Sequence, residues 1–553
     1  MRSSSLTALC LILLLCTPPG FAQDQATAAN EPKAPELPAV QPLEVPQRLG
    51  ITGERQLSLP DVISMVLEND RDLLVSRITA AESLLNVKSA LGYYDPVLGL
   101  NAYRVKSVTP VASLLGGAAN GKLTQKQLYA DPQISGISPW LGGSYQLDFA
   151  SSRQSTDSTF VILNPQFPSA ATLNLTQPLL GGLKFDQNRY RVQVARKNVQ
   201  LTGNQLRQRV IEVVTQAIQA YWELDFAYRN LAVQIEAVRL AEQQDASNRR
   251  QVQQGILAPV DVIQTQTQVS TFQQNVFLAQ DTLTRAENAL KTLILPSRTD
   301  ALWSMALTPT TPPGVPVEIP DVESAVRDGL AQRPELAESR IGIEVNQLDS
   351  RLNAEQARPQ ISAVATLSAQ GLSGRPVAVV PNPILEQFGF PTTVLPAIFP
   401  GGYSQSLDNL YHGRFPTVQV GVQMSLPIRN RTANAQSAIS KAEGRRLAAQ
   451  QQLVVMNIQA DVRNSLQSLA TARARLNAAQ SARQFAESQY ASEQRQFQAG
   501  TSSVFLVLQR QTDLVAARSR EIRAGADAGR ATADLDRATA RTLSAHSIDL
   551  KSP

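Results

Sequence analysis

The sequence is poor in the residues that carry most enzyme chemistry. Its 553 residues include only 2 cysteines and 2 histidines, and aromatic residues make up 5% of the chain. So few histidines leave little for metal binding or for proton transfer near neutral pH. The low content of Phe, Tyr and Trp argues against a large enzyme core, which usually uses these side chains as bulky filler. The composition therefore disfavours an enzyme.

Strong charge of one sign and long apolar runs are also missing. Lys and Arg total 51 against 46 for Asp and Glu, which is too even a balance to indicate nucleic-acid binding. The mean hydropathy is −0.15, and after the first 22 residues no apolar run has the length of a membrane-spanning helix. The sequence has no G-x-x-x-x-G-K-[ST] pattern, and its histidines, His412 and His546, do not lie at ligand spacing. We therefore expect no cofactor and no metal.

Residues 1–22 have the features of a secretory signal peptide. Arg2 precedes an apolar core from Leu6 to Leu15, and Ala22 offers a cleavage position. Both cysteines, Cys10 and Cys16, lie in this segment, so the exported chain is expected to form no disulfide. Lipidation of Cys16 is the alternative, although Leu15 stands where a small residue is usual.

The remaining chain indicates an internal duplication. Pro60-Asp61-Val62 recurs as Pro320-Asp321-Val322, and the thirteen residues from Gly255 align without gaps to those from Gly500. We predict a flexible Pro/Ala-rich segment at 23–56, a first repeat at 57–295 and a linker at 296–320. A second repeat at 321–543 and a tail at 544–553 complete the chain.

Long helices dominate both repeats, so the predicted fold class is mostly α with some β. Val210, Val214, Ala217, Tyr221 and Leu224 begin a seam of alternating four- and three-residue spacings that continues to Val238, a pattern typical of coiled-coil packing. A second seam starts at Val455. Helices are expected at 61–69, 71–92, 187–254, 259–295, 321–332, 334–357, 429–498 and 503–540.

Strands are expected between the helices of each repeat. In 417–426 the residues Val418, Val420, Val422 and Met424 alternate with polar ones, as in a tilted membrane strand with its apolar face toward lipid. Shorter patterns occur at 97–104, 171–177 and 360–368, and a possible hairpin joins 143–150 to 158–164. A half-buried sheet of a water-soluble protein has the same period, so both interpretations stay open.

Together these features resemble the TolC-like outer-membrane efflux family. The resemblance covers residues 57–543. It depends on the duplicated helix–strand–strand–helix plan and on the glycine turns, each followed by Val or Pro four residues later. The strand endings Gln177-Pro178-Leu179 and Ser425-Leu426-Pro427 also match. It implies a homotrimer whose 12 strands form one outer-membrane barrel, continuous with a coiled-coil tunnel in the periplasm. It further implies docking to a periplasmic adaptor protein and an inner-membrane transporter.

The resemblance places the periplasmic gate and the adaptor contacts at the two glycine turns. The residues concerned are Gly255, Pro259, Asp261, Gly500 and Ser503, with Arg249 and Arg250 beside the first turn. Members of the family often carry aspartates after the second glycine, where this chain has Leu506 and Gln509. Asp261 is either a ring of charge in a trimer or a cap for its own helix, and the two arginines either dock a partner or form a solvated face.

Two other functions remain open from the sequence. The same duct could serve a type I system that secretes polypeptides, and a non-transporting periplasmic coiled-coil scaffold would explain the helices if the strands were soluble. The sequence also leaves open the role of residues 108–142 and 372–412, and whether the 143–164 hairpin belongs to the barrel.

Overall fold

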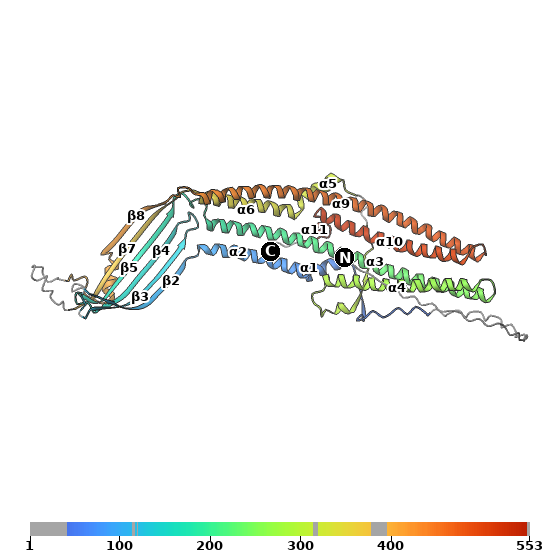
Figure 1. The fold of residues 1–553 in the computed structure, drawn as a ribbon, viewed down its shortest axis with the longest axis horizontal. Coiled ribbons are helices and arrows are strands. Elements are labelled where there is room, and N and C mark those ends of the chain that lie inside the picture. Colours follow the sequence, from blue (N-terminus) through green and yellow to red (C-terminus); the bar gives the residue numbers. More distant parts are fainter. Residues whose placement is uncertain are drawn as a thin grey trace, which may run out of the picture.

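The computed structural model describes residues 41–112, 117–118, 120–312, 314, 319–377 and 395–549. The signal segment predicted at residues 1–22 lies outside them. The described chain is elongated: a sheet forms one end, and helices run from it to two hairpin turns at the other end (Figure 1). None of the helices in these ranges combines the length and apolar character needed to cross a bilayer.

The helices match the predicted ranges to within about two residues, the usual uncertainty of helix ends. The first half contains α1 (Leu59–Asn69), α2 (Arg71–Leu91), α3 (Gln187–Gln253) and α4 (Pro259–Ile294). The second half repeats this order with α5 (Val322–Gln332), α6 (Pro334–Gln356), α9 (Arg431–Gln498) and α10 (Val504–Ala538). The helices α2 and α4 share one long partner, α3, and α6 and α10 share α9 (Figure 1).

The main core surrounds the middle of α3, where α1, α4 and the strand β6 (Met305–Pro309) meet it. Tyr221 is fully buried there; its hydroxyl accepts a hydrogen bond from the Thr311 N–H at 2.9 Å and donates to the Leu57 carbonyl at 3.3 Å. The predicted seam is buried from Val210 to Leu224, but Tyr228 and Ile235 face outward. Ala227 and Gln234, one residue earlier in each case, take the inner positions instead. The Gln234 amide there donates to the Ser519 hydroxyl of α10 at 3.2 Å.

The sheet at the other end contains six strands. Its order is β2-β3-β4-β5-β7-β8, with every neighbouring pair antiparallel. The strands are β2 (Val97–Pro110), β3 (Lys122–Ile137), β4 (Ser144–Thr156), β5 (Leu163–Pro178), β7 (Gln360–Pro376) and β8 (Phe415–Ser425). A barrel of 12 strands from three copies would use four strands per chain, whereas the sheet of this chain contains six.

The strand β3 was not among the predicted strands. It occupies nearly half of the segment 108–142. The sequence left this segment unassigned because Pro132 and Gly136 are residues that usually interrupt strands. In the structure the pairing of β3 with β4 is interrupted between Ala130 and Gln133, which accommodates the missing N–H of Pro132. The predicted hairpin arm at 158–164 is wrong, since residues 157–162 form the turn that precedes β5.

The other unassigned segment, 372–412, includes the short helix α8 (Tyr403–Tyr411). This helix packs against the ends of β5 and β7 that lie far from the long helices (Figure 1). The Ser406 hydroxyl contacts that of Ser169 at 2.7 Å, and the Asn409 amide donates to the Leu372 carbonyl at 2.9 Å. These buried polar contacts place α8 on the sheet.

The segment predicted as a flexible tether is held against the body from residue 41 onward. Gln273 and Gln280 of α4 donate hydrogen bonds to the carbonyls of Gln41 and Pro46, and Arg48 forms an ion pair with Glu287. The strand β1 (Gly53–Leu57) then pairs in parallel with β6. The Pro-rich composition of this segment suggested flexibility. Side chains of α4 hold it in place, and its own residues carry no pattern that predicts these contacts.

A glycine in α10 allows the second hairpin to pack closely on the first. A Cβ added at Gly529 would lie 2.7 Å from ring atoms of Trp222, which is buried on α3. We expect Gly529→Ala to lower the free energy of unfolding by about 1–3 kcal/mol through overpacking. Gly203→Ala in α3 meets no atom within 4 Å and should raise it by about 0.5–1 kcal/mol. Thermal unfolding followed by circular dichroism measures both; shifts of the same sign would contradict this account.

Candidate functional site

The first hairpin turn joins α3 to α4 at the end of the molecule farthest from the sheet. Gly255 has φ +71°, a left-handed conformation that favours glycine. Its N–H donates to the Val252 carbonyl at 3.0 Å, and the Ile256 N–H donates to Gln251 at 2.9 Å. Together these bonds close the end of α3 in a Schellman-like cap.

The start of α4 explains the positions of Pro259 and Asp261. Pro259 opens the helix, where a missing N–H costs nothing. The Asp261 carboxylate accepts a hydrogen bond from the Ala258 N–H at 3.2 Å. Asp261 therefore stands in a helix-capping position, which is one of the two roles considered from the sequence; the ring of charge needs further copies of the chain.

The second turn, between α9 and α10, repeats the geometry of the first. Gly500 has φ +76°, and its N–H donates to the Phe497 carbonyl at 3.0 Å. Ser503 caps α10 by accepting a hydrogen bond from the Leu506 N–H at 3.4 Å. The matching backbone conformations are the structural counterpart of the gap-free alignment between the two segments.

Polar contacts behind the first turn fix α3 to α4. Asp245 is buried; its carboxylate forms an ion pair with Arg249 at 2.7 Å and accepts a hydrogen bond from the Thr265 hydroxyl at 2.9 Å. Arg250 is exposed in the last turn of α3, where a cation interacts favourably with the helix dipole. The two adjacent arginines thus differ: Arg249 is engaged within the hairpin, and Arg250 faces solvent.

Both turns also expose apolar side chains that the sequence analysis did not single out as a group. These tip residues are Ile256, Val260 and Ile263 at the first turn and Phe505 and Leu506 at the second. Phe505 is 61% exposed. The signal in the sequence was the run of apolar residues around each glycine, which also fits an ordinary helix start. Exposed apolar residues beside an exposed cation are typical of a surface that contacts another protein.

The second candidate site is the apolar face of the sheet. Val418, Val420, Val422 and Met424 all point to one face of β8 and are exposed. Strand pairing extends this face in register through every strand. One row of directly paired residues runs across the whole sheet: Leu98, Ile134, Leu147, Leu173, Leu367 and Val418. The apolar face is therefore a property of all six strands.

The opposite face of the sheet is polar and internally hydrogen-bonded. Asp148 of β4 accepts hydrogen bonds from the amides of Gln146 at 2.7 Å and Asn174 at 3.3 Å. Asn174 in turn accepts one from the Thr366 hydroxyl at 2.9 Å. The sheet thus separates an apolar side from a polar side that water can solvate.

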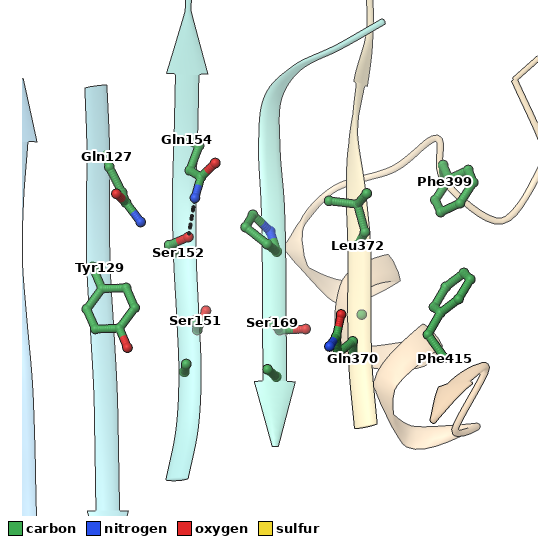
Figure 2. Close-up of a pocket in the computed structure, with 14 residues that line it drawn as sticks. Gln127, Tyr129, Ser151, Ser152, Gln154, Ser169, Gln370, Leu372, Phe399 and Phe415 are labelled. Atoms are coloured by element: carbon green, nitrogen blue, oxygen red, sulfur yellow. Dashed lines mark hydrogen bonds between the residues drawn. The ribbon is translucent and has the colours of Figure 1, made fainter. Parts of the chain in front are cut away.

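A hollow of about 590 Å³ lies on the polar face near the end that carries α8. Figure 2 shows that side chains from β3, β4, β5 and β7 line it, among them Gln127, Tyr129, Gln154 and Gln370. Phe399 and Phe415 stack at one side with ring centroids 5.9 Å apart. Polar, aromatic and small side chains of the sheet make up most of this lining. In the described parts of the chain, no three His, Cys, Asp or Glu residues are grouped so that they could hold a metal ion.

A carboxyl group of the helical body has a pKa near neutrality. Glu338 lies on α6, and partial burial together with Glu335 and Glu212 raises its pKa from 4.5 to about 7. The folded state therefore binds this proton more tightly than the unfolded state, and stability falls as the pH rises from about 4.5 to 7. Because the side chain is only half buried, we expect Glu338→Gln to stabilise the protein by about 1 kcal/mol at pH 8.

The same variant should have almost no effect at pH 4, because Glu338 is then protonated in both states. Chemical denaturation at the two pH values measures the difference. A stabilisation of equal size at both would show that the pKa of Glu338 is not the cause.

Comparisons with known proteins agree with this architecture. A family model described as outer membrane efflux protein matches residues 139–294 and 325–541, more than half of the chain. No curated protein matches the sequence. Among solved structures, the chain resembles the outer-membrane channel OprN with a TM-score of 0.61 and 13% identity, covering 87% of this chain and 89% of that one.

Two further channels give similar values. The CmeC outer membrane channel of Campylobacter jejuni has a TM-score of 0.60 and 15% identity, with 89% and 90% of the two chains covered. The outer membrane protein VceC of Vibrio cholerae has a TM-score of 0.57 and 16% identity, with 87% and 95% covered. At these identities the likeness establishes the shared fold.

Proposed function

This chain belongs to the outer membrane efflux protein family, and we propose that it forms a homotrimeric channel that conducts small molecules passively across the outer membrane. The helices would extend into the periplasm, and the shared barrel of three copies would cross the membrane. A periplasmic adaptor protein and an inner-membrane transporter would deliver the substrate. The energy would come from the transporter, since the sequence has no P-loop pattern.

The observation that carries this proposal is the apolar row across all strands of an open sheet. In the described chain the outer edges of β2 and β8 pair with no other strand. Unpaired backbone groups are too costly in lipid, where only closed barrels and helices satisfy them. Further copies must therefore cover both edges. The strand β2 leaves the helical end and β8 returns to it (Figure 1), so the two edges can pair in the antiparallel direction.

The tip residues would form the contact with the adaptor. The two turns lie at the same end of the elongated molecule (Figure 1). Three copies would present six such turns in a ring around the periplasmic entrance. Ile256 and Phe505 would supply apolar contacts, and Arg250 would add a solvated charge at the rim.

Two measurements test the function directly. The purified trimer in planar bilayers should give discrete conductance steps, and a strain lacking the gene should accumulate a fluorescent efflux substrate until the gene is restored. A silent trimer that is correctly inserted would contradict the channel. A protein that leaves the membrane pellet after a carbonate wash would instead indicate the periplasmic scaffold, and loss of polypeptide secretion alone would indicate a type I system.

A substitution at the second turn separates its role from folding. Gly500→Val places a β-branched residue at φ +76°, which costs about 1–2 kcal/mol and distorts the tip. We expect export to fall by about tenfold while the trimer remains intact. The matched control is Gly50→Val, since Gly50 also has φ +76° and open space around its Cβ but lies far from the tips. Equal loss of export in both variants would contradict the assignment of the tip.

A further inference from the structure

We propose that three copies of this chain close an 18-stranded barrel, so that the membrane sector is wider than a 12-stranded one. This inference rests on the proposed trimeric channel. It starts from the sheet, in which each chain contributes six strands; three copies of six give eighteen.

The additional strands belong to one repeat only. In the second half two strands, β7 and β8, separate α6 from α9. In the first half four strands, β2 to β5, separate α2 from α3. The long helices nevertheless correspond one to one between the halves. The first repeat therefore has two more strands than the second but the same number of long helices. The sheet is widened relative to the helical part.

The strands β3 and β4 share the two faces of the rest of the sheet. Ile134 and Leu147 continue the apolar row between Leu98 and Leu173. On the polar face Gln133 pairs with Asp148 in register, and the hydrogen bonds of Asp148 continue the polar network toward β5. A hairpin that projected into water would have no reason to keep an apolar face in register with β8. This pattern places β3 and β4 in the membrane wall.

The turn between β3 and β4 is fixed at the boundary between the sheet and the helices. The Gln177 amide at the end of β5 donates to the Leu141 carbonyl at 3.0 Å, and Arg189 at the start of α3 donates to the Pro139 carbonyl at 3.4 Å. Trp140 in this turn is 86% exposed. An exposed tryptophan at the end of an apolar strand band is typical of a membrane–water interface. The hairpin thus spans the same depth as its neighbours.

Barrel width follows from the number of strands. Diameter grows roughly linearly with that number, so eighteen strands give a barrel about 1.5 times as wide as twelve, with about twice the cross-section. Barrels of 16–18 strands leave a water-filled channel. The four helices that meet each sheet, α2, α3, α6 and α9, provide no matching increase in the tunnel. The membrane sector is therefore widened relative to the helical part.

The test compares neighbouring residues on β3 with neighbouring residues on β8. Both native cysteines lie in the predicted signal peptide, so single-cysteine variants of the exported protein can be labelled cleanly. A membrane-impermeant maleimide should label Gln133→Cys as fast as Gln419→Cys, because both would face the lumen. Ile134→Cys and Val420→Cys should both react at least about tenfold more slowly, because both would face lipid. Electron microscopy of the trimer gives the strand count independently.

The outcomes separate the inference from the function. One outcome is that Val420→Cys is shielded and Gln419→Cys is reactive, while Ile134→Cys is labelled fast or Gln133→Cys is labelled slowly. This outcome would agree with a channel but would show that β3 is not part of its wall. A trimer that shows 12 strands would have the same meaning. Equal labelling of Val420→Cys and Gln419→Cys would contradict the membrane barrel itself, and with it the proposed function.

Discussion

Replacing Glu287 by Gln is expected to lower the free energy of unfolding by about 3–5 kcal/mol, a typical cost of removing one partner from a buried ion pair. The side chains of Glu287 and Lys291 are both 0% exposed, and their charged atoms lie 2.6 Å apart. The glutamine is nearly isosteric but leaves the Lys291 ammonium buried without a counter-charge. Denaturant unfolding followed by circular dichroism measures the loss.

The position of this pair explains why the effect should be global. Lys291 also donates hydrogen bonds to the carbonyls of Trp303 at 3.0 Å and Met305 at 2.6 Å, which hold β6 against α4. Glu287 binds Arg48 of the N-terminal segment. Glu287 thus holds the segment that precedes the first repeat directly, and through Lys291 it supports the segment that follows the repeat. Both segments should loosen when its charge is removed.

The matched control lies on the same helix. Asp281 and Arg285 form a pair with the same spacing, but their side chains are 58% and 81% exposed. Asp281→Asn should change the free energy of unfolding by less than about 0.5 kcal/mol. The double variant Glu287→Gln, Lys291→Met should be less unstable than Glu287→Gln alone, because no unpaired ammonium remains. A larger loss in the double variant would show that the charge pair is not the main source of stability.

Replacing Val420 by Arg is expected to prevent stable insertion of the protein into the outer membrane. Val420 lies near the middle of the apolar side of β8 and is 76% exposed. An arginine on the lipid face of a barrel costs about 2–4 kcal/mol near the middle of the bilayer. In a homotrimer the cost is incurred in each of three copies. The amount of trimer in the washed outer-membrane fraction measures the effect.

The neighbouring residue provides the control. Gln419 lies on the polar face of the same strand, paired with Thr366, so Gln419→Arg would put its charge into the lumen. It should insert normally and alter the ion selectivity of the conductance. If both arginine variants insert equally well, the apolar face does not face lipid, and the membrane orientation proposed for the sheet is wrong.

Much of the fold was predictable because its signals are local. The long helices α3 and α9 each contain a heptad seam. A glycine between two helical patterns indicates each of the turns at Gly255 and Gly500. The segment 417–426, which lies in β8 except for its last residue, has ten residues of strict alternation. The strand β3 was missed because Pro132 and Gly136 carry the local signal of a loop, although Leu128, Ala130 and Ile134 alternate with polar residues.

The candidate site at the tips also combines features that are local in sequence with features that depend on packing. The glycines and caps of the tips were predictable from the residues nearby. That Arg249 is engaged with Asp245 while Arg250 is exposed depends on how α3 turns against α4. The exposure of Phe505 and Ile256 likewise follows from what the hairpins leave uncovered. Neither fact can be predicted from helical periodicity, because the periodicity does not tell which residues near a turn remain uncovered.

The sequence by itself determined the two long hairpins, their glycine turns and the two-faced character of the best strand, since each depends on residues a few positions apart. Only the tertiary structure decided that four strands of the first repeat join two of the second in one sheet, because strand partners such as Leu173 and Leu367 lie far apart in the chain. It also decided that Arg48 reaches Glu287. These contacts depend on long-range packing, and in the sheet they also depend on a register that aligns the apolar residues of neighbouring strands. No local pattern specifies which distant segment will be the partner.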